Sequence, residues 1–176
     1  MTVIRIVAAV VVDERGRLLL VRKRGTTAFM QPGGKLEPGE SAVDALVREV
    51  REELGVGITE VRELGHHNAI AANEPGHSVA ADLFFVRLDG VPQIAAEIEE
   101  MLWIDPHAPG DIELAPLTRD ETVQMLTATF GGAQPPIGLV DAEVPGATPK
   151  KPASGLIAYS RPSSPGRIHA MSSPIV

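Results

Sequence analysis

The sequence predicts an α/β domain over residues 1–130 and a separate tail over residues 131–176. Strand-type and helix-type segments alternate through the first part and are joined by short turns, as in layered α/β domains. The total length of 176 residues fits one domain of ordinary size. The tail holds 8 of the 15 prolines and 6 of the 17 glycines, so we expect it to be flexible. Within it, Gly155–Ser160 is the segment that could add a strand.

The strand segments are rich in apolar and β-branched residues. Val3–Val12 has no basic region before it and no cleavage site, which indicates a buried strand rather than a signal peptide. A turn at Asp13–Arg17 leads to Leu18–Arg22, so the first two strands are predicted to form a hairpin. Gln31–Gly34 is a loop by composition. The later strands are expected at Ile58–Gly65, Ser78–Leu88 and Met101–Ile104.

Two segments predict helices. Ser41 is a suitable N-cap for a helix over Ser41–Leu54, and Gly55 stands where a C-cap is expected. The second helix covers Thr118–Phe130, with Thr118 as its N-cap. Apolar residues recur every three or four positions in the first helix and define its buried face: Val43, Leu46, Val47, Val50 and Leu54.

Charge and composition exclude several classes of protein. The net charge is −7, and the tail contributes 4 bases and 2 acids, so residues 1–130 carry −9. An acidic domain is unsuited to holding nucleic acid by phosphate neutralisation. The absence of cysteine excludes disulfides and thiolate metal sites. No apolar run reaches about 18 residues, so no transmembrane helix and no membrane partner is predicted. We expect a cytoplasmic protein that is a monomer or a homodimer.

Chemistry-bearing residues concentrate in the first helix. Glu49, Glu52 and Glu53 have the spacing that places carboxylates along one helical face. Neighbouring carboxylates repel one another, and a hard cation such as Mg²⁺ or Mn²⁺ removes that conflict. The alternative is a solvated acidic face with Arg–Glu pairs such as Arg48–Glu52, which is common on surface helices.

The loop before the helix favours the metal-binding interpretation of these glutamates over a solvated acidic face. Read from Gly34, the sequence runs glycine, five residues, Glu40, seven residues, and then Arg48–Val56 (REVREELGV). This resembles the signature of the Nudix hydrolase family, and all nine specified positions within 23 residues are filled. The flanking Arg22–Arg24, Pro32–Gly34 and Glu97–Trp103 also resemble family features. The resemblance covers residues 2–130 and leaves the tail unexplained.

The resemblance implies an α/β/α sandwich with a mixed sheet, in which the motif forms a loop–helix–loop. It also implies a Mg²⁺-dependent enzyme, with Mn²⁺ as a substitute, that hydrolyses a pyrophosphate linked to a nucleoside. The implied metal ligands are Glu49, Glu52, Glu53 and a carbonyl oxygen of the glycine turn, assigned to Gly34. Arg48 would orient a glutamate, Glu40 would brace the helix, and Gly55 would end it. Glu52 and Glu53 rank first for the metal, while Glu49 and Glu100 compete as general base.

Candidates outside the motif each have a plainer alternative. One of Arg22 and Arg24 is expected to face a phosphate, the alternative being a solvated strand edge. Lys35 is a second candidate for a phosphate contact, and Phe29 a candidate for covering a base. Glu97 and Glu100 either return to the metal site or form a solvated acidic loop.

Trp103 and the histidines are expected to have mainly structural roles. Trp103 is expected to pack in the core rather than stack on a base. His66, His67 and His77 do not have zinc-ligand spacing, although His67 or Asn68 could line a pocket.

The substrate is predicted from domain size. A domain of about 130 residues resembles the small family members that convert a (deoxy)nucleoside triphosphate, including oxidised dGTP, to the monophosphate and pyrophosphate. The alternatives are an ADP-ribose or nucleotide-sugar pyrophosphatase and a non-catalytic nucleotide sensor. The complete set of metal ligands argues against the sensor.

Overall fold

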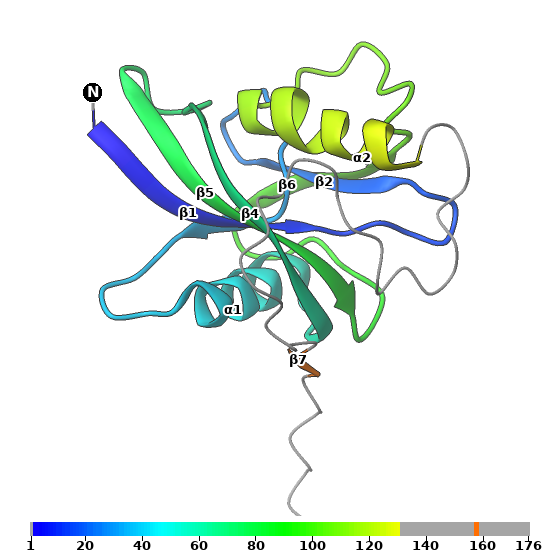
Figure 1. Ribbon diagram of the computed structural model, residues 1–176, viewed down its shortest axis with the longest axis horizontal. Helices are drawn as coiled ribbons and strands as arrows, with labels where there is room; N and C mark the ends of the chain where they lie inside the picture. The colour runs from blue at the N-terminus through cyan, green and yellow to red at the C-terminus, as the bar shows by residue number, and fades with distance from the viewer. Residues whose placement is uncertain (1, 131–156, 159–176) are drawn as a thin grey trace, which may run out of the picture.

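The computed structural model describes residues 2–130 and 157–158, and its elements are arranged as strands between two helices (Figure 1). Strands β1, β2 and β3 precede α1, strands β4, β5 and β6 follow it, and η1 continues directly into α2. Their bounds are β1 (Thr2–Val10), β2 (Leu18–Lys23), β3 (Gly33–Lys35), α1 (Ala42–Leu54), β4 (Ile58–Ile70), β5 (His77–Leu88), β6 (Ile98–Ile104), η1 (Thr118–Thr122), α2 (Val123–Phe130) and β7 (Ile157–Ala158).

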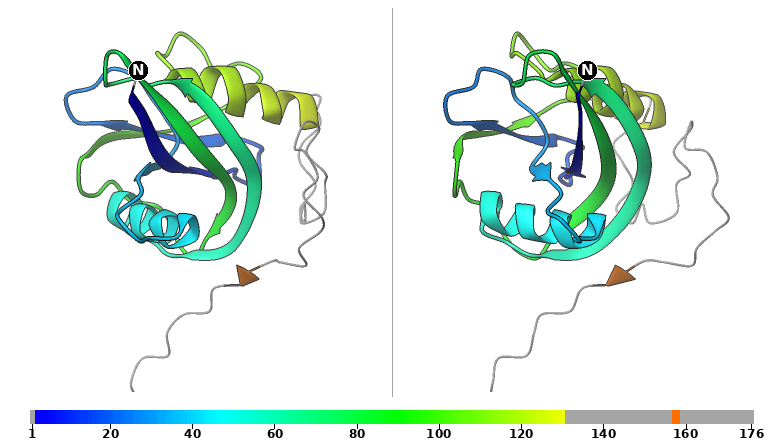
Figure 2. Two further views of the ribbon diagram at one scale, coloured as in Figure 1. Left: turned by 60° about the vertical axis from the view of Figure 1, so that its left-hand side comes forward. Right: turned by 90° about the vertical axis from the view of Figure 1, so that its left-hand side faces the viewer.

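The strands form a mixed five-stranded sheet in the order β3-β1-β5-β4-β7 and a two-stranded sheet of β2 and β6. β1 is parallel to β5 and antiparallel to β3, while β4 is antiparallel to β5. α1 and α2 lie on opposite sides of the strands, so the expected sandwich with a mixed sheet is confirmed (Figure 1). Figure 2 shows β4 and β5 as long, strongly curved strands with α1 on their concave side.

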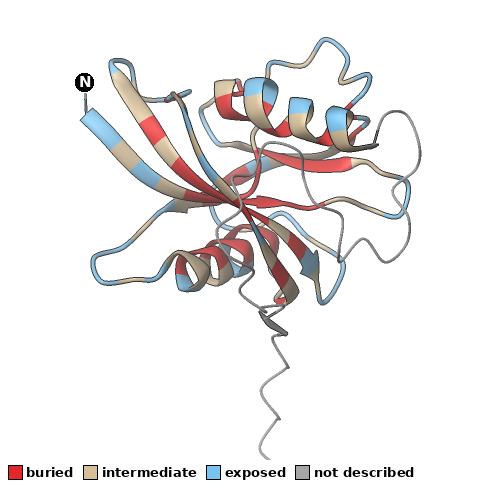
Figure 3. Cartoon of the chain, in the orientation of Figure 1, coloured by how far each residue is buried: buried red, intermediate tan, exposed pale blue. Residues whose placement is uncertain are grey.

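The core lies between the helices and the strands (Figure 3). One cluster joins the apolar face of α1, including Leu46 and Val50, to inward residues of β1 and β5 such as Val7 and Phe84. Trp103 packs against this cluster, which confirms its expected place in the core. A second cluster joins β1, β2 and β5 to Leu126 of α2 and to Leu117 just before η1. α1 is therefore held against the sheet along its length.

Both expected caps of α1 are present. Ser41 accepts a hydrogen bond from the Asp44 backbone N–H at 3.1 Å. Gly55 adopts a left-handed conformation with φ of 65° and donates its N–H to the Arg51 carbonyl.

Four elements differ from the sequence-based expectation. The hairpin expected from the first two strands is limited to the residues next to its turn, where Val12 and Leu18 form a bridge and Leu19 donates to the Val11 carbonyl, while β1 pairs along its length with β5 and β2 pairs with β6. β4 extends to Ile70, since its pairing with β5 continues past a register shift near Gly65. Gly33–Lys35 is a short strand rather than only loop. The segment starting at Thr118 is a π-helix, and no side chain caps it.

The tail is described only at β7, which pairs antiparallel with β4 and lies within the segment Gly155–Ser160. The expected flexibility of residues 131–176 otherwise falls outside the described residues. In the part of the chain that the structure describes, no helix is both long and apolar enough to cross a membrane.

Candidate active site

The glycine turn at β3 brings the backbone against the acids of α1. Gly33 has φ of 149°, and a Cβ there would lie 2.1 Å from the Val7 carbonyl oxygen. Its N–H donates to Glu53 Oε2 at 2.9 Å. A Cβ on Gly34 would lie 2.3 Å from Glu49 Oε1, so the Glu49 carboxylate rests directly on this glycine. The close approach of the Val7 backbone therefore requires glycine at position 33, and the absence of a side chain at Gly34 leaves room for the Glu49 carboxylate.

The three glutamates of α1 do not share one environment. Glu49 and Glu53, four residues apart, lie on the buried face of the helix, and the Glu53 side chain is 0% exposed. Glu52 is turned toward solvent, with a side-chain exposure of 53%. The structure thus brings two of the expected metal ligands to the glycine turn and leaves the third at its edge.

Arg48 connects the start of the motif to its acids. Its guanidinium donates two hydrogen bonds of 2.9 Å to Glu40 and one of 2.7 Å to Glu49. A further bond of 3.1 Å reaches the Lys35 carbonyl. Hydrogen bonds from Arg48 and from the Glu37 N–H lower the pKa of Glu40 to about 2. Glu40 therefore stays ionised and fixes Arg48, which in turn fixes Glu49.

Lys23, at the end of β2, lies opposite Glu53. Its Nζ is 2.8 Å from Glu53 Oε1, 3.0 Å from Glu97 Oε1 and 3.3 Å from the Gly33 carbonyl oxygen. Burial raises the pKa of Glu53 to about 7, although Lys23 and the Gly33 N–H act in the opposite direction. Burial also disfavours the charged ammonium, but Glu53 and Glu97 hold the pKa of Lys23 above its usual value.

Glu100 and Arg22 are paired with each other. Arg22 lies 2.7 Å from Glu99 and 2.9 Å from Glu100, and its guanidinium stacks over Phe29 at 5.7 Å from the ring centroid. Glu97 rather than Glu100 therefore shares the Lys23 ammonium with Glu53. Phe29 is 7% exposed and is not among the residues that line the pocket described below.

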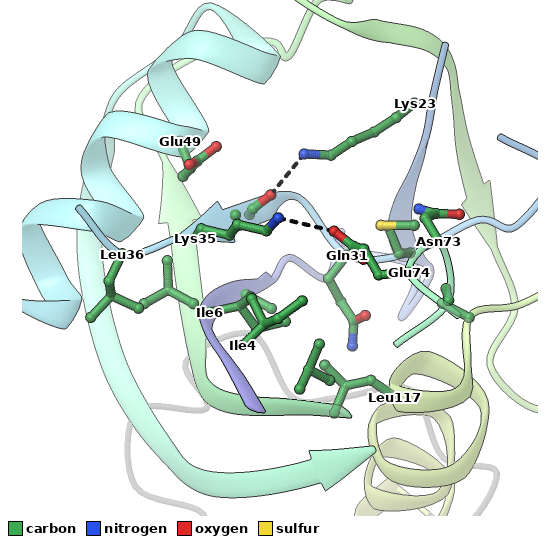
Figure 4. Close-up of a pocket in the computed structure, with 18 of the residues that line it drawn as sticks. Ile4, Ile6, Lys23, Gln31, Lys35, Leu36, Glu49, Asn73, Glu74 and Leu117 are labelled. Carbon is green, nitrogen blue, oxygen red and sulfur yellow. Dashed lines mark hydrogen bonds and ion pairs between the residues drawn. The ribbon is translucent and has the colours of Figure 1, made fainter. Parts of the chain in front are cut away.

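A pocket of about 600 Å³ opens beside these acids (Figure 4). Lys23 and Glu49 lie at one end, and the aliphatic side chains of Ile4, Ile6 and Leu117 lie at the other. Lys35 forms an ion pair of 3.0 Å with Glu74 at the pocket. One end of the pocket is thus charged and the other apolar, as in sites that hold a charged group attached to an apolar body.

The remaining candidates lie elsewhere. Arg24 donates to the Ala96 carbonyl at 3.4 Å. His67 pairs with Glu121 at 2.7 Å, and neither His67 nor Asn68 is among the pocket-lining residues. His66 contacts Asp82 and His77 contacts the Pro75 carbonyl, so the three histidines have separate partners.

The donor atoms near Glu53 fit a hard divalent cation. Across residues 2–130, no three carboxylate or imidazole groups converge on one point, since Lys23 separates Glu53 from Glu97. However, Glu53 Oε1 is buried and lies 2.8 Å from the Lys23 ammonium, so this oxygen already faces a cation. The nearby Gly33 carbonyl supplies a second oxygen. Oxygen donors of this kind are those that Mg²⁺ and Mn²⁺ prefer.

The sequence does not predict which groups surround Glu53, namely Lys23, Glu97 and the Gly33 carbonyl. Alternation of side chains along β2 indicates that Lys23 points away from Arg22, but it does not say which of them faces the acids. Gln31 was also missed. Its side-chain amide donates to Thr122 and accepts from Thr118 at 2.6 Å, beneath the pocket.

Comparisons with known proteins identify the family of the chain. A family profile described as NUDIX domain matches residues 3–126. A CTP pyrophosphohydrolase of Escherichia coli (strain K12) is 30% identical over 125 residues, which cover 66% of this chain and 86% of that protein. A Bacillus subtilis (strain 168) protein, named provisionally as an 8-oxo-dGTP diphosphatase, is 30% identical over 99 residues, covering 55% of this chain and 63% of that protein. A MutT-like protein of Streptomyces ambofaciens is 35% identical over 100 residues, with coverages of 57% and 62%.

The chain thus spans somewhat less than two thirds of the last two relatives. Among solved structures, one from a study of MutT of Aliivibrio salmonicida and Vibrio cholerae has a TM-score of 0.59 and 25% identity, covering 73% of this chain and all of that one. A MutT protein from Methanosarcina mazei Go1 has a TM-score of 0.61, and its 24% identity supports likeness of fold alone; the match covers 72% of this chain and 94% of that one.

Proposed function

Because the chain belongs to the Nudix hydrolase family, we propose that it is a Mg²⁺-dependent pyrophosphohydrolase that converts a nucleoside triphosphate to the monophosphate and pyrophosphate. The observation that carries the proposal is the buried oxygen Oε1 of Glu53 beside the glycine turn, which faces a cation, the Lys23 ammonium, at 2.8 Å. A carboxylate oxygen in that position is costly unless a cation satisfies it. The pocket next to it has room for a nucleotide-sized ligand.

The inner residues would hold the cation. Glu53 supplies the buried oxygen, the Gly33 carbonyl faces the same point, and Glu49 lies against Gly34 next to it. Glu52, exposed on the same helix, can reach the site by rotation of its side chain. When bound, Mg²⁺ would neutralise the diphosphate and lower the pKa of a coordinated water. Compared with the expected ligand set, the backbone oxygen shifts from Gly34 to Gly33.

The protein's own residues would then position the substrate and take up the proton. Lys35, at the pocket, can exchange its ion pair with Glu74 for a phosphate. Glu49 is better placed than Glu100 to accept a proton from water, because Glu49 lines the pocket whereas Glu100 pairs with Arg22. Arg48 holds Glu49 in place through its 2.7 Å bond.

The shape of the pocket supports a substrate that carries a nucleoside. Its charged end would receive the phosphates, and the aliphatic end formed by Ile4, Ile6 and Leu117 would receive the base. Aliphatic walls exclude water from a planar base without selecting among bases. The relatives named for CTP and 8-oxo-dGTP favour a triphosphate over a nucleotide sugar.

The test is a substrate panel with the full-length protein and Mg²⁺. Nucleoside triphosphates, 8-oxo-dGTP, ADP-ribose and UDP-sugars are incubated separately, and the products are separated by ion-exchange chromatography. We expect monophosphate and pyrophosphate from a triphosphate, and a loss of about 100-fold or more in Glu53→Gln. Glu113→Gln is the matched control, since Glu113 is exposed and distant in the chain from the motif.

Other outcomes would replace the proposal. Faster cleavage of ADP-ribose or a UDP-sugar would assign the enzyme to that substrate class. Binding without turnover of any compound, with either Mg²⁺ or Mn²⁺, would indicate a sensor.

A further inference from the structure

We propose that Lys23 is a displaceable internal cation. Its ammonium occupies the position between Glu53, Glu97 and the Gly33 carbonyl. When a divalent cation binds at that position, the ammonium moves to the substrate phosphates. The proposal rests on the proposed function, because it requires that a metal bind at Glu53. Lys23 would first occupy the metal position in the free protein and would then contact the phosphates of the bound substrate.

The contacts of Lys23 are those of a cation ligand set. All three partners of its Nζ are oxygens, at 2.8, 3.0 and 3.3 Å. They come from α1, from the segment before β6 and from β3, so the ammonium joins three separate parts of the chain. Among the described residues, Lys23 is the basic side chain that forms an ion pair with Glu53. An ammonium and a divalent ion cannot both occupy this position, since like charges repel strongly in a buried site.

A bulge in β6, with Glu99 as its extra residue, lies opposite Arg22 and Lys23 of β2. The register of pairing with β6 shifts between Arg22 and Lys23, so that Arg22 pairs with Glu100 but Lys23 pairs with Ile98. Bulges of this kind redirect side chains and are frequent beside active sites. The bulge brings both Glu99 and Glu100 to Arg22, whereas Lys23, the next residue of β2, points to the opposite face and contacts Glu53.

A lysine side chain is suited to moving away from the position between these oxygens. Its charge is compact and sits on a flexible four-carbon stem, so it can move several ångströms without a change in the backbone. The Lys23 side chain is 23% exposed and lines the pocket together with Glu49 and Lys35. A displaced ammonium would therefore enter the space assigned to the phosphates.

This exchange couples metal and substrate binding. Without substrate, Lys23 competes with the metal for Glu53 and weakens its binding. With substrate present, the phosphates offer Lys23 a new partner, so displacement costs less and the metal binds more tightly. By linkage, the metal must strengthen substrate binding by the same factor.

Metal binding without substrate tests the competition directly. Mn²⁺ is titrated into the full-length protein, and the free ion is followed by electron paramagnetic resonance. We expect Lys23→Met to bind Mn²⁺ about three- to tenfold more tightly than wild type, because the competing ammonium is gone. Arg87→Met is the control for the loss of one positive charge, since Arg87 pairs with Glu60 away from the site. An affinity for Lys23→Met no higher than that of Arg87→Met would overturn the proposal.

Chemical labelling of the wild-type protein tests the movement and does not depend on any variant folding. Lysines are acetylated briefly with and without Mg²⁺, and the label at residue 23 is quantified by mass spectrometry. We expect faster labelling with Mg²⁺, because the ammonium leaves its ion pairs. Labelling that is unchanged or slower would show that Lys23 stays in place and would overturn the proposal.

Glu53→Gln distinguishes the metal site from the displacement of Lys23. It should lose Mn²⁺ binding if Glu53 is a metal ligand, as the proposed function requires. Retained Mn²⁺ binding in Glu53→Gln would overturn the metal site itself. Lost binding in Glu53→Gln together with unchanged binding in Lys23→Met would overturn only the displacement of Lys23.

Discussion

Arg48 and Glu40 are joined by two hydrogen bonds of 2.9 Å, formed by Nε and by a terminal nitrogen of the guanidinium. This bidentate pair links the loop before α1 to the middle of the helix. The same guanidinium holds Glu49 at 2.7 Å, so the position of Glu49 depends on Glu40 through one intermediate residue.

Arg48→Lys should therefore impair the site while leaving the fold intact. A lysine keeps the positive charge but cannot reproduce the planar fork that binds Glu40 and Glu49 together. We expect hydrolysis to fall by about 10–100-fold, as is typical when residues that orient metal ligands are changed. Steady-state kinetics at saturating Mg²⁺ measure the effect. Arg51→Lys, on the exposed side of the same helix, should retain wild-type activity; a similar loss there would contradict the assignment.

The two glycines of the turn should respond differently to alanine. At Gly33 a Cβ would collide with the Val7 backbone in a conformation with φ of 149°, so Gly33→Ala should destabilise the domain by about 1–3 kcal/mol or more. At Gly34 the Cβ would meet only the end of the Glu49 side chain. Gly34→Ala should therefore keep most of the stability and lose metal binding.

Thermal denaturation together with Mn²⁺ titration distinguishes these cases. Gly90→Ala is the control, because a Cβ there would find its nearest neighbour at an ordinary 3.5 Å. Equal loss of stability in both turn variants would show that Glu49 cannot yield to the methyl group.

The sequence predicts α1 well because the information is local. Ser41 and Gly55 lie next to the helix ends that they cap, and the apolar stripe lies within the helix itself. The family motif likewise falls within one continuous stretch. In contrast, the predicted hairpin is confirmed only next to its turn, because the longer pairing of β1 with β5 and of β2 with β6 depends on segments distant in the chain.

The contacts that complete the candidate site are also distant in sequence. Lys23 and Glu97 are separated by 74 positions and meet only because β2 pairs with β6. Sequence reasoning reached the acidic segment but favoured Glu100, since it could not locate the register shift beside Lys23. The buried face of α1 contains Glu49 and Glu53 but not Glu52, which the shared spacing of the three residues does not reveal.

The stability of the metal-free protein should depend on pH through Glu53. Its pKa rises on folding from the ordinary 4.5 to about 7, with burial as the main cause. A carboxyl group with a raised pKa favours folding below pH 4.5, and this contribution is lost as the pH rises through about 7. Relative to Glu53→Gln, the wild-type protein should lose at most about 3 kcal/mol of stability between these values.

Urea denaturation at several pH values, with a chelator present, measures this difference. Glu40→Gln provides a contrast, since the pKa of Glu40 is lowered to about 2. Its contribution is present above pH 4.5 and is lost as the pH falls toward 2. A wild-type curve parallel to that of Glu53→Gln from pH 4.5 to 7 would contradict the burial of an ionisable Glu53.

The buried cluster of Gln31, Thr118 and Thr122 should be important for stability beneath the pocket. Thr118 and Thr122 are 0% exposed, and both bond to the Gln31 amide from successive turns of the η1 segment. Thr122→Val keeps the volume but leaves a Gln31 N–H without its partner, which should cost about 1–3 kcal/mol. Thr122→Ser should restore most of that loss by returning the hydroxyl. Thr127→Val is the matched control, because the Thr127 hydroxyl bonds the Gln124 carbonyl at an exposed position. Equal melting temperatures of Thr122→Val and Thr127→Val would show that the stability of the domain does not depend on the bond between Gln31 and Thr122.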